Sequence, residues 1–221
     1  MPIVFSAKLD GSEAIRHLHI SLVTFYLRQA RRHAMASASI PKEDDQHFAE
    51  SVIAVLFSAL CLEAFSNEMA EEVISEQDLP DFWKMRRRFR TPKQYRSSVT
   101  WKLACLFETQ WSHSLASDAG LVRRIESLFE LRNSLVHYNL TNSAGHVHLP
   151  APSQIPVEGG GFMTVIDFAQ PATRVEKPLI STVDDKTARD SYNTGLIVLQ
   201  LWNRLAKAPE SALAAHQELT D

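Results

Sequence analysis

The sequence predicts an all-α protein, an up-and-down helical bundle of four to five helices with a long Gly/Pro-containing insertion before the last helix. Three observations support this fold class. Only seven of the 221 residues are glycine, which argues against a sheet-rich, turn-rich fold. Apolar residues recur every three or four positions through most of the chain. The links between these stretches are mostly short, as they are between antiparallel neighbours in a bundle.

Five stretches carry the helical spacing. The first covers residues 12–34 and opens with Ser12 as a candidate N-cap. The second, residues 46–77, is long and apolar enough to be the central helix. The third covers about residues 96–110, the fourth runs from about Leu121 to Tyr138, and the last covers about residues 184–206. We expect the polar residues 209–221 to fray.

The insertion, residues 141–182, has a different composition. It contains four glycines, five prolines and one strand-like run, FMTVIDF. The length of the chain favours one domain over two, so we expect residues 1–221 to form a single helical domain that carries this insertion.

Composition narrows the class of protein. The formal net charge of −3 gives no global attraction to nucleic acid or to an anionic membrane, so binding to polyanions requires a local patch. Cys61 and Cys105 both lie in apolar runs, which is typical of buried thiols in a reduced, cytoplasmic protein. The N-terminus lacks the pattern of a signal peptide. The longest apolar run, residues 52–62, is about half the ~20 residues that a membrane span needs, so we expect a core helix and no membrane partner.

The segment LFELRNSLVHYN, residues 128–139, places Arg132, Asn133 and His137 on the fourth helix. At about 100° per residue, Asn133 and His137 share a face, whereas Arg132 lies roughly 140° from His137. One helix therefore does not direct all three side chains to one point. The long arginine side chain, or a second copy across a two-fold dimer, could complete the cluster.

Such a cluster suits phosphodiester chemistry. Arginine can hold phosphate oxygens and stabilise charge in the transition state, and histidine can transfer protons near neutral pH. RNA supplies its own nucleophile, the 2′-hydroxyl, so this chemistry does not strictly require a metal. The alternative is that Arg132 pairs with Glu126 or Glu130 on the surface and has no catalytic role.

The second helix strengthens the functional interpretation. Glu63 lies within an otherwise apolar surface, and Asn67 follows one turn later on the same face. A carboxylate in such a place needs a partner, and Arg132 or His137 of the fourth helix is the obvious candidate. A structural ion pair and a functional network are both compatible with this pattern.

The combination of LEAFSNE at residues 62–68 with RNSLVH at residues 132–137 resembles the HEPN superfamily. The hallmark of that family is an arginine, four to six residues of which the first is polar, and then a histidine. The resemblance covers the helical body, about residues 12–140 and the last helix, and excludes the insertion. It implies a bundle that dimerises through the motif helices, so that both copies face one composite cleft.

The resemblance also implies a function. Many members are metal-independent endoribonucleases, hydrolases in the broad sense, that act in toxin–antitoxin, antiphage defence or RNA-processing systems, and others are inactive RNA- or protein-binding modules. The implied catalytic residues are Arg132 and His137, with Asn133 orienting them and Glu63 supporting the network. The implied partners are a second copy of the chain, RNA, and an antitoxin or other protein, with no cofactor.

Two further positions complete the implied site. Asn67 is expected to support Glu63, and Tyr138 stands beside the histidine. In one subgroup of the family, a nucleotidyltransferase partner modifies a tyrosine two residues after the histidine. This chain departs from that pattern, because it has Asn139 there.

Residues 84–96, KMRRRFRTPKQYR, form the strongest local concentration of charge. A uniform spread of the 23 lysines and arginines would place between one and two in such a segment, and it contains seven. Aromatic residues are interleaved, so the segment is a candidate track for single-stranded RNA. The alternative is a solvated connector paired with Glu71, Glu72 and Glu76. The seven basic residues are Lys84, Arg86, Arg87, Arg88, Arg90, Lys93 and Arg96.

His146 and His148 could share one face of a strand, but no cysteine or carboxylate cluster accompanies them. We therefore expect no metal site. The sequence leaves two functions open, an endoribonuclease and a non-catalytic module that binds RNA or protein.

Overall fold

The computed structural model describes residues 3–10, 13–85, 89, 95–137, 146–147, 153–165, 175–176, 182–207, 213 and 216–220. The chain divides into two compact units. The helical unit comprises Met1–Val136 and Val183–Asp221, and the second unit comprises His137–Thr182. The predicted insertion, residues 141–182, falls within the second unit.

The helical unit begins with a β-hairpin rather than a helix. Strand β1, Ile3–Asp10, pairs antiparallel with β2, Glu13–Ile20, from Ile3 opposite Ile20 to Asp10 opposite Glu13. The predicted helix over residues 12–34 is therefore wrong for residues 13–20, and the proposed cap Ser12 lies outside the described residues. The physical reason is the preceding segment, residues 3–10, which is rich in residues that favour strands and pairs with residues 13–20. In the sequence, two residues of a composition typical of hairpins, Gly11-Ser12, separate the strands.

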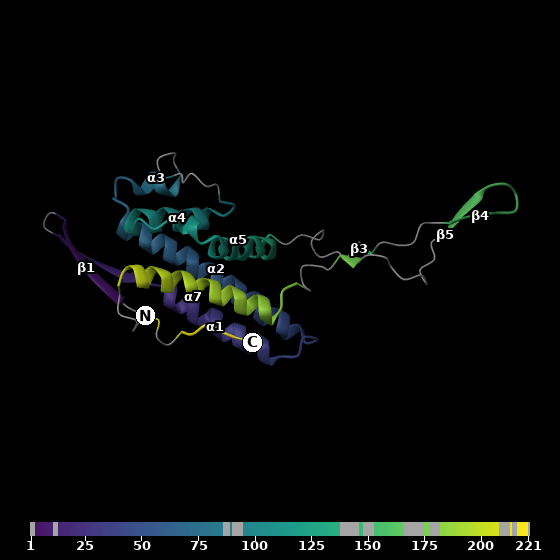
Figure 1. Ribbon diagram of the computed structural model, residues 1–221, viewed down its shortest axis with the longest axis horizontal. Coiled ribbons are helices and arrows are strands. Elements are labelled where there is room, and N and C mark those ends of the chain that lie inside the picture. Colours follow the sequence, from purple (N-terminus) through teal and green to yellow (C-terminus); the bar gives the residue numbers. More distant parts are fainter. Residues whose placement is uncertain are drawn as a thin grey trace. The chain divides into compact units, whose positions relative to one another are not determined.

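Six α-helices form the described part of this unit. They are α1 (Val23–Ser39), α2 (Asp45–Val73), α3 (Leu79–Trp83), α4 (Ser98–Trp111), α5 (Ala119–Val136) and α7 (Asp185–Leu205). Helix α2 is central, because it packs against α1, α4, α5 and α7 (Figure 1). This arrangement confirms the predicted all-α bundle, with the hairpin as a small addition.

Polar caps set the ends of several helices. The side chain of Asp44 accepts a hydrogen bond at the start of α2, Ser97 accepts two at the start of α4, and Asp184 accepts one at the start of α7. Each cap satisfies backbone N–H groups that have no partner within the helix. Helix α4 ends at Ser112, which takes the left-handed conformation with φ of 50°.

The core lies between α2 and its neighbours. Leu27, Leu62 and Leu196, from α1, α2 and α7, are fully buried. Gly195 lets α7 approach closely, since a Cβ atom there would lie 3.8 Å from Leu27 Cδ1 and 3.9 Å from the Ser58 carbonyl oxygen. Both predicted thiols, Cys61 and Cys105, are free and buried.

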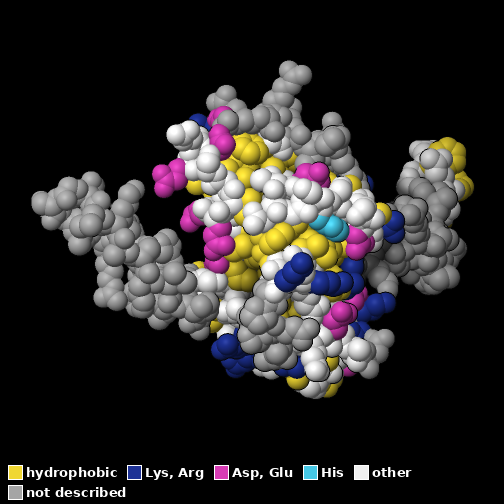
Figure 2. Space-filling view, turned by 60° about the vertical axis from the view of Figure 1, so that its left-hand side comes forward, with side chains coloured by type: hydrophobic (Ala, Val, Ile, Leu, Met, Phe, Trp, Pro, Cys, Tyr) yellow, Lys and Arg dark blue, Asp and Glu magenta, His cyan; other side chains and the backbone are white. Residues whose placement is uncertain are grey.

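Part of the apolar surface remains half-exposed. Figure 2 shows a face with hydrophobic side chains gathered at its centre, acidic side chains mainly along its left edge and basic ones mainly in its lower half.

Among the described residues, α2 is the one helix long and apolar enough to cross a membrane by length and composition, and 44% of its most apolar window is buried. Core helices of globular bundles meet the same criterion, and α2 supplies much of this core.

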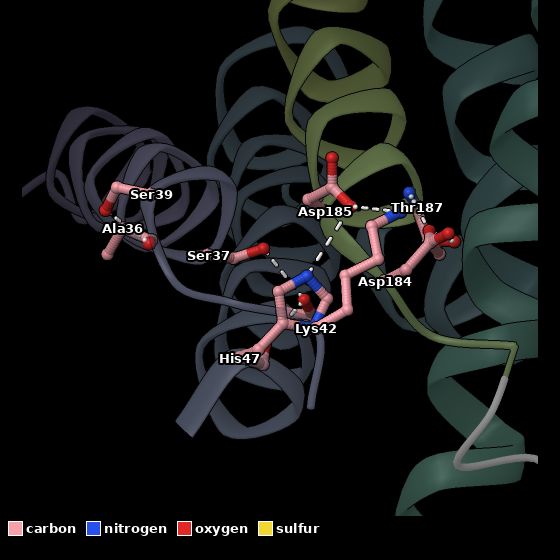
Figure 3. Close-up of polar contacts among 9 residues, drawn as sticks. Ala36, Ser37, Ser39, Lys42, His47, Asp184, Asp185 and Thr187 are labelled. Atoms are coloured by element: carbon pink, nitrogen blue, oxygen red, sulfur yellow. Dashed lines mark hydrogen bonds and ion pairs between the residues drawn. The ribbon is translucent and has the colours of Figure 1, made fainter. Parts of the chain in front are cut away.

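A polar cluster joins the starts of α2 and α7 (Figure 3). The Lys42 ammonium lies 3.2 Å from Asp185 Oδ1, and the buried His47 Nε2 lies 3.5 Å from the same oxygen. Beside them, the hydroxyl groups of Ser37 and Ser51 are 2.9 Å apart. Burial raises the pKa of Asp185, but the hydrogen bond and charge of Lys42 and the contact with His47 outweigh burial and lower it overall. These contacts link the start of α2 to the start of α7 at one end of the bundle.

The second unit contains short strands. Strand β4, Ser153–Pro156, pairs with β5, Phe162–Val165, and β3, His146–Val147, pairs with β6, Val175–Glu176. Strand β5 lies within the run FMTVIDF that the sequence predicted to be strand-like. The β4–β5 turn uses positive φ angles at three consecutive glycines, residues 159–161.

Candidate functional site

The candidate site lies where α2 meets α4 and α5. On α2, Glu63 and Asn67 are one turn apart, in the midst of core residues such as Leu62 and Phe65. The apolar residues of α2 pack into the core. Glu63 and Asn67 therefore lie at the edge of that core, where α2 meets α4 and α5. The Glu63 side chain is 29% exposed. Water can therefore reach the site, although the carboxylate is partly desolvated.

Arg132 on α5 pairs with Glu63. The distance from Arg132 Nη2 to Glu63 Oε1 is 3.3 Å, and the Arg132 side chain is 27% exposed. Arg132 Nη1 also donates a hydrogen bond of 3.0 Å to Asn133 Oδ1. The contact between the second and fourth predicted helices is therefore present, and it involves the arginine of the motif.

The alternative partners of Arg132 are engaged elsewhere. Glu126 Oε1 accepts a hydrogen bond of 2.9 Å from the backbone N–H of Arg96. Glu130 Oε2 lies 3.7 Å from Arg96 Nη1. The sequence left open a surface pairing of Arg132 with Glu126 or Glu130. In the structure, Arg132 pairs with Glu63 instead.

Lys102 on α4 belongs to the same cluster and was not predicted. Its Nζ atom donates a hydrogen bond of 3.2 Å to Asn67 Oδ1 and lies 4.6 Å from the ring centroid of Trp83. Burial lowers the pKa of Lys102, and the nearby charge of Glu63 opposes that shift. The sequence does contain a signal for Lys102, because it is the one charged residue in the apolar run WKLACLF. A charged side chain among apolar residues needs a polar partner, as Glu63 does.

His137 lies beyond the end of α5. Helix α5 ends at Val136, so the helical-face argument that aligned Asn133 with His137 does not extend to the histidine. His137 follows in a turn, its side chain is exposed, and it is the first residue of the second unit. Tyr138 lies outside the described residues. The helical unit thus brings together four of the predicted site residues, Glu63, Asn67, Arg132 and Asn133.

The basic segment is described only at its ends. Lys84 is exposed directly after α3, and Arg96 is exposed and engaged with two glutamates of α5. The glutamates are not the predicted Glu71, Glu72 or Glu76. The other five predicted RNA-binding residues lie outside the described residues: Arg86, Arg87, Arg88, Arg90 and Lys93.

A pocket lies beside Arg96 along α5. Its volume is about 400 Å³, and its lining includes Arg96, Arg123, Glu126 and Glu130. Charges of both signs face the pocket, so it has no clear preference for anions. Among the residues that the structure describes, no three His, Cys, Asp or Glu side chains lie close enough to hold a metal ion.

Comparison of the chain with family models, curated proteins and solved structures found no match. The residues of the cluster are therefore the basis for any function proposed for this chain.

The cluster combines two cations with one carboxylate. Arg132 contacts Glu63 and Lys102 contacts Asn67, and these two residues of α2 are one turn apart, so the two pairs form a polar strip, with Lys102 over the ring of Trp83. A phosphate group could replace Glu63 as the partner of Arg132, because both present oxygens in a geometry that guanidinium binds. The strip is therefore suited to hold an anionic ligand.

Proposed function

We propose that the chain is a HEPN-like protein that cleaves single-stranded RNA without a metal ion, through Arg132 and His137, as a homodimer in the cytoplasm. The single observation that carries the proposal is the contact between Glu63 and Arg132. These residues belong to the two sequence segments on which the resemblance rests, and they are 69 positions apart in the chain.

The proposed reaction begins at the 2′-hydroxyl of the RNA. His137 takes the hydroxyl proton while the 2′-oxygen forms a bond to phosphorus, and the bond from phosphorus to the 5′-oxygen breaks. The His137 of a second copy donates a proton to that leaving oxygen. Arg132 balances the charge on the phosphate oxygens in the transition state. The products are a 2′,3′-cyclic phosphate and a free 5′-hydroxyl.

A homodimer is part of the proposal because the reaction uses two histidines, one as base and one as acid, and each copy supplies one His137. Two copies related by a two-fold axis would provide two arginines and two histidines at one interface. Mass measurement by size-exclusion chromatography with light scattering tests this part directly, and a monomer at micromolar concentration would contradict it.

The second candidate function is a non-catalytic module that binds RNA or a protein partner such as an antitoxin. The position of His137 favours it, because the histidine is exposed beyond the end of α5, and the helix therefore does not fix its side chain. In that case the pair of Glu63 and Arg132 stabilises packing, and the anion site binds without cleaving.

One experiment separates the two functions. Purified protein is incubated with single-stranded RNA in the presence of a chelator, and the products are analysed for cyclic phosphate ends. We expect cleavage by the wild type, none by His137→Ala, and a loss of about 100-fold or more for Arg132→Ala, since each removes a group that acts on the transition state. Arg124→Ala is the matched control, because Arg124 is an exposed arginine on the same helix.

The same samples are tested for RNA binding and for folding by circular dichroism. Binding without cleavage by folded wild-type protein would replace the endoribonuclease by the binding module. Cleavage that survives His137→Ala, or that requires a divalent metal, would contradict the mechanism.

A further inference from the structure

Residues 216–220 lie along α7 instead of fraying as the sequence predicted. Figure 1 shows the described C-terminal residues returning along α7 toward its N-terminal end. The hydrogen bonds follow that direction, because the segment contacts Tyr192 first, then Asn193, and finally Arg189, which is nearer the start of α7.

Helix α7 contacts the backbone of this segment. Asn193 Nδ2 donates a hydrogen bond of 2.9 Å to the carbonyl oxygen of Leu219, and Asn193 Oδ1 accepts one of 2.9 Å from the Leu219 N–H. The Tyr192 hydroxyl donates to the carbonyl oxygen of Gln217 at 3.1 Å, and Arg189 donates to that of Thr220 at 3.3 Å. One side-chain amide thus satisfies both polar groups of one residue, as a neighbouring strand would do.

Two of the three α7 residues that make these contacts are buried. Asn193 is 6% exposed, and Tyr192 is fully buried. Burial raises the pKa of Tyr192 to about 12, although the charge of Arg31 opposes the shift. A buried amide and a buried hydroxyl need hydrogen-bond partners, and the backbone of this segment provides them. An asparagine in the interior of a helix has low intrinsic propensity, so a specific contact accounts for its presence there.

Two side chains of the segment take part in the contact. His216 Nδ1 lies 3.5 Å from the Tyr192 hydroxyl oxygen, and Leu219 is half-buried and packs against the core. Gln217, Glu218 and Thr220 are exposed, so the sequence at these positions is free to vary.

The geometry of the contact is that of a peptide-binding site, because it combines recognition of backbone groups with one apolar anchor, Leu219. Burial lowers the pKa of the neighbouring His216, and the charges of Arg31 and Arg28 on α1 lower it further.

We propose that the surface of α7 around Asn193 is a binding site for a short peptide, and that residues 216–220 occupy it as a built-in ligand. The ligand class is a short segment that offers its backbone N–H and carbonyl groups to Asn193 and carries an apolar residue at the position of Leu219. A peptide of this kind from a protein partner would replace residues 216–220 without any change in the helices. This proposal is independent of RNA cleavage.

The test uses the full chain with a substitution that releases its own segment. Leu219→Lys removes the apolar anchor and adds a positive charge to a segment that faces Arg28 and Arg31. A fluorescently labelled peptide of residues 213–221 is then titrated with the variant and with the wild type, and its anisotropy is recorded. We expect the variant to bind the peptide at least tenfold more tightly, because the wild-type segment competes for the site.

A second substitution locates the binding. Asn193→Ala in the Leu219→Lys background removes two hydrogen bonds to the peptide and is expected to weaken its binding about tenfold or more. Asn203→Ala in the same background is the matched control, because Asn203 is another asparagine of α7 and lies outside the contact with residues 216–220. A labelled peptide that carries lysine at the Leu219 position should not bind.

Three results would overturn the proposal. The first is a folded Leu219→Lys variant that does not bind the peptide at millimolar concentration. The second is equal binding to the wild type, the Leu219→Lys variant and the Asn193→Ala double variant, which would place the peptide elsewhere. The third is loss of the helical circular-dichroism signal in Leu219→Lys, which would make residues 216–220 a required part of the fold and not an exchangeable ligand.

Discussion

The ion pair between Glu63 and Arg132 permits a quantitative prediction. Its two charged atoms are 3.3 Å apart, and both side chains are a little more than one quarter exposed. At that distance the Coulomb energy is about 1.3 kcal/mol in a medium with the dielectric constant of water. Partial burial strengthens the attraction, whereas the entropy of ordering two long side chains weakens it. We therefore expect a net coupling of about 1 kcal/mol, at the upper end for exposed pairs.

A double-mutant cycle measures this coupling. The wild type, Glu63→Gln, Arg132→Gln and the double variant are unfolded with urea, and their unfolding free energies are compared. The sum of the two single losses should exceed the loss in the double variant by about 1 kcal/mol. The difference should shrink at an ionic strength of about 1 M, where the screening length is about 3 Å.

A parallel cycle of Glu63→Gln with Arg124→Gln is the control, and its coupling should be zero within error. Arg124 is exposed on the same helix and carries the same charge. Strictly additive losses for Glu63 and Arg132 at low salt would refute the reasoning, because they would show that the pair is not formed in solution.

The remaining predictions concern stability, protonation and reactivity. Asp184→Ala removes the cap of α7 and should lower the unfolding free energy by about 1 kcal/mol in urea titrations. Burial raises the pKa of Asp184, but the hydrogen bonds it accepts from the first turn of α7 lower it below its ordinary 3.8, so its contribution should be present above about pH 4 and disappear in more acidic solution. For His216, burial and the two arginines of α1 lower the pKa below 6.5. The docked segment therefore binds fewer protons than a released one, and hydrogen-exchange protection of the Leu219 amide should fall as the pH drops below about 6.5; protection that rises in acid would contradict this. Burial raises the pKa of Cys61, so a disulfide reagent at pH 8 should not label this thiol in the folded protein but should label it in denaturant, and rapid labelling of folded protein would contradict its burial.

The sequence predicted the later helices well because their apolar spacing and their caps agree. The predicted second helix, residues 46–77, corresponds to α2 at Asp45–Val73, and the predicted last helix, residues 184–206, corresponds to α7 at Asp185–Leu205. In both cases a carboxylate side chain caps the first turn, so local chemistry and long-range packing favour the same boundary.

The start of the chain shows where local patterns are insufficient. Residues 13–20 fit a helical period only approximately, and their partner is another segment, residues 3–10. A hairpin depends on hydrogen bonds to another segment, and a search for helical spacing within one segment does not detect them. The spacing from Val23 onward was sufficient, and α1 begins there.

Part of the candidate site followed from one physical argument. A carboxylate among apolar residues needs a partner, and this argument predicts Arg132 or His137 as the partner of Glu63; the structure shows Arg132. The same argument applied to Lys102 would have found the third member of the cluster. The position of His137 could not be derived, because it depends on α5 ending at Val136, and helix ends are poorly determined by spacing alone.

The C-terminal segment was mispredicted for a related reason. The sequence of residues 209–221 is polar, and polar tails are commonly mobile. Its contacts with Tyr192 and Asn193 are hydrogen bonds to its backbone, which the identity of its side chains does not reveal. The apolar signal is limited to Leu213 and Leu219, which pack against the core but are too few to give a periodic pattern.

The close approach at Gly195 indicates how the protein could be made more heat-resistant. The space beside this glycine holds one methyl group at ordinary van der Waals distance from Leu27 and Ser58. Gly195→Ala would restrict the denatured ensemble and raise the melting temperature, with a gain of about 0.5–1 kcal/mol. A branched residue such as valine would instead force α7 away from its neighbours, so this one position admits a single methyl group and nothing larger.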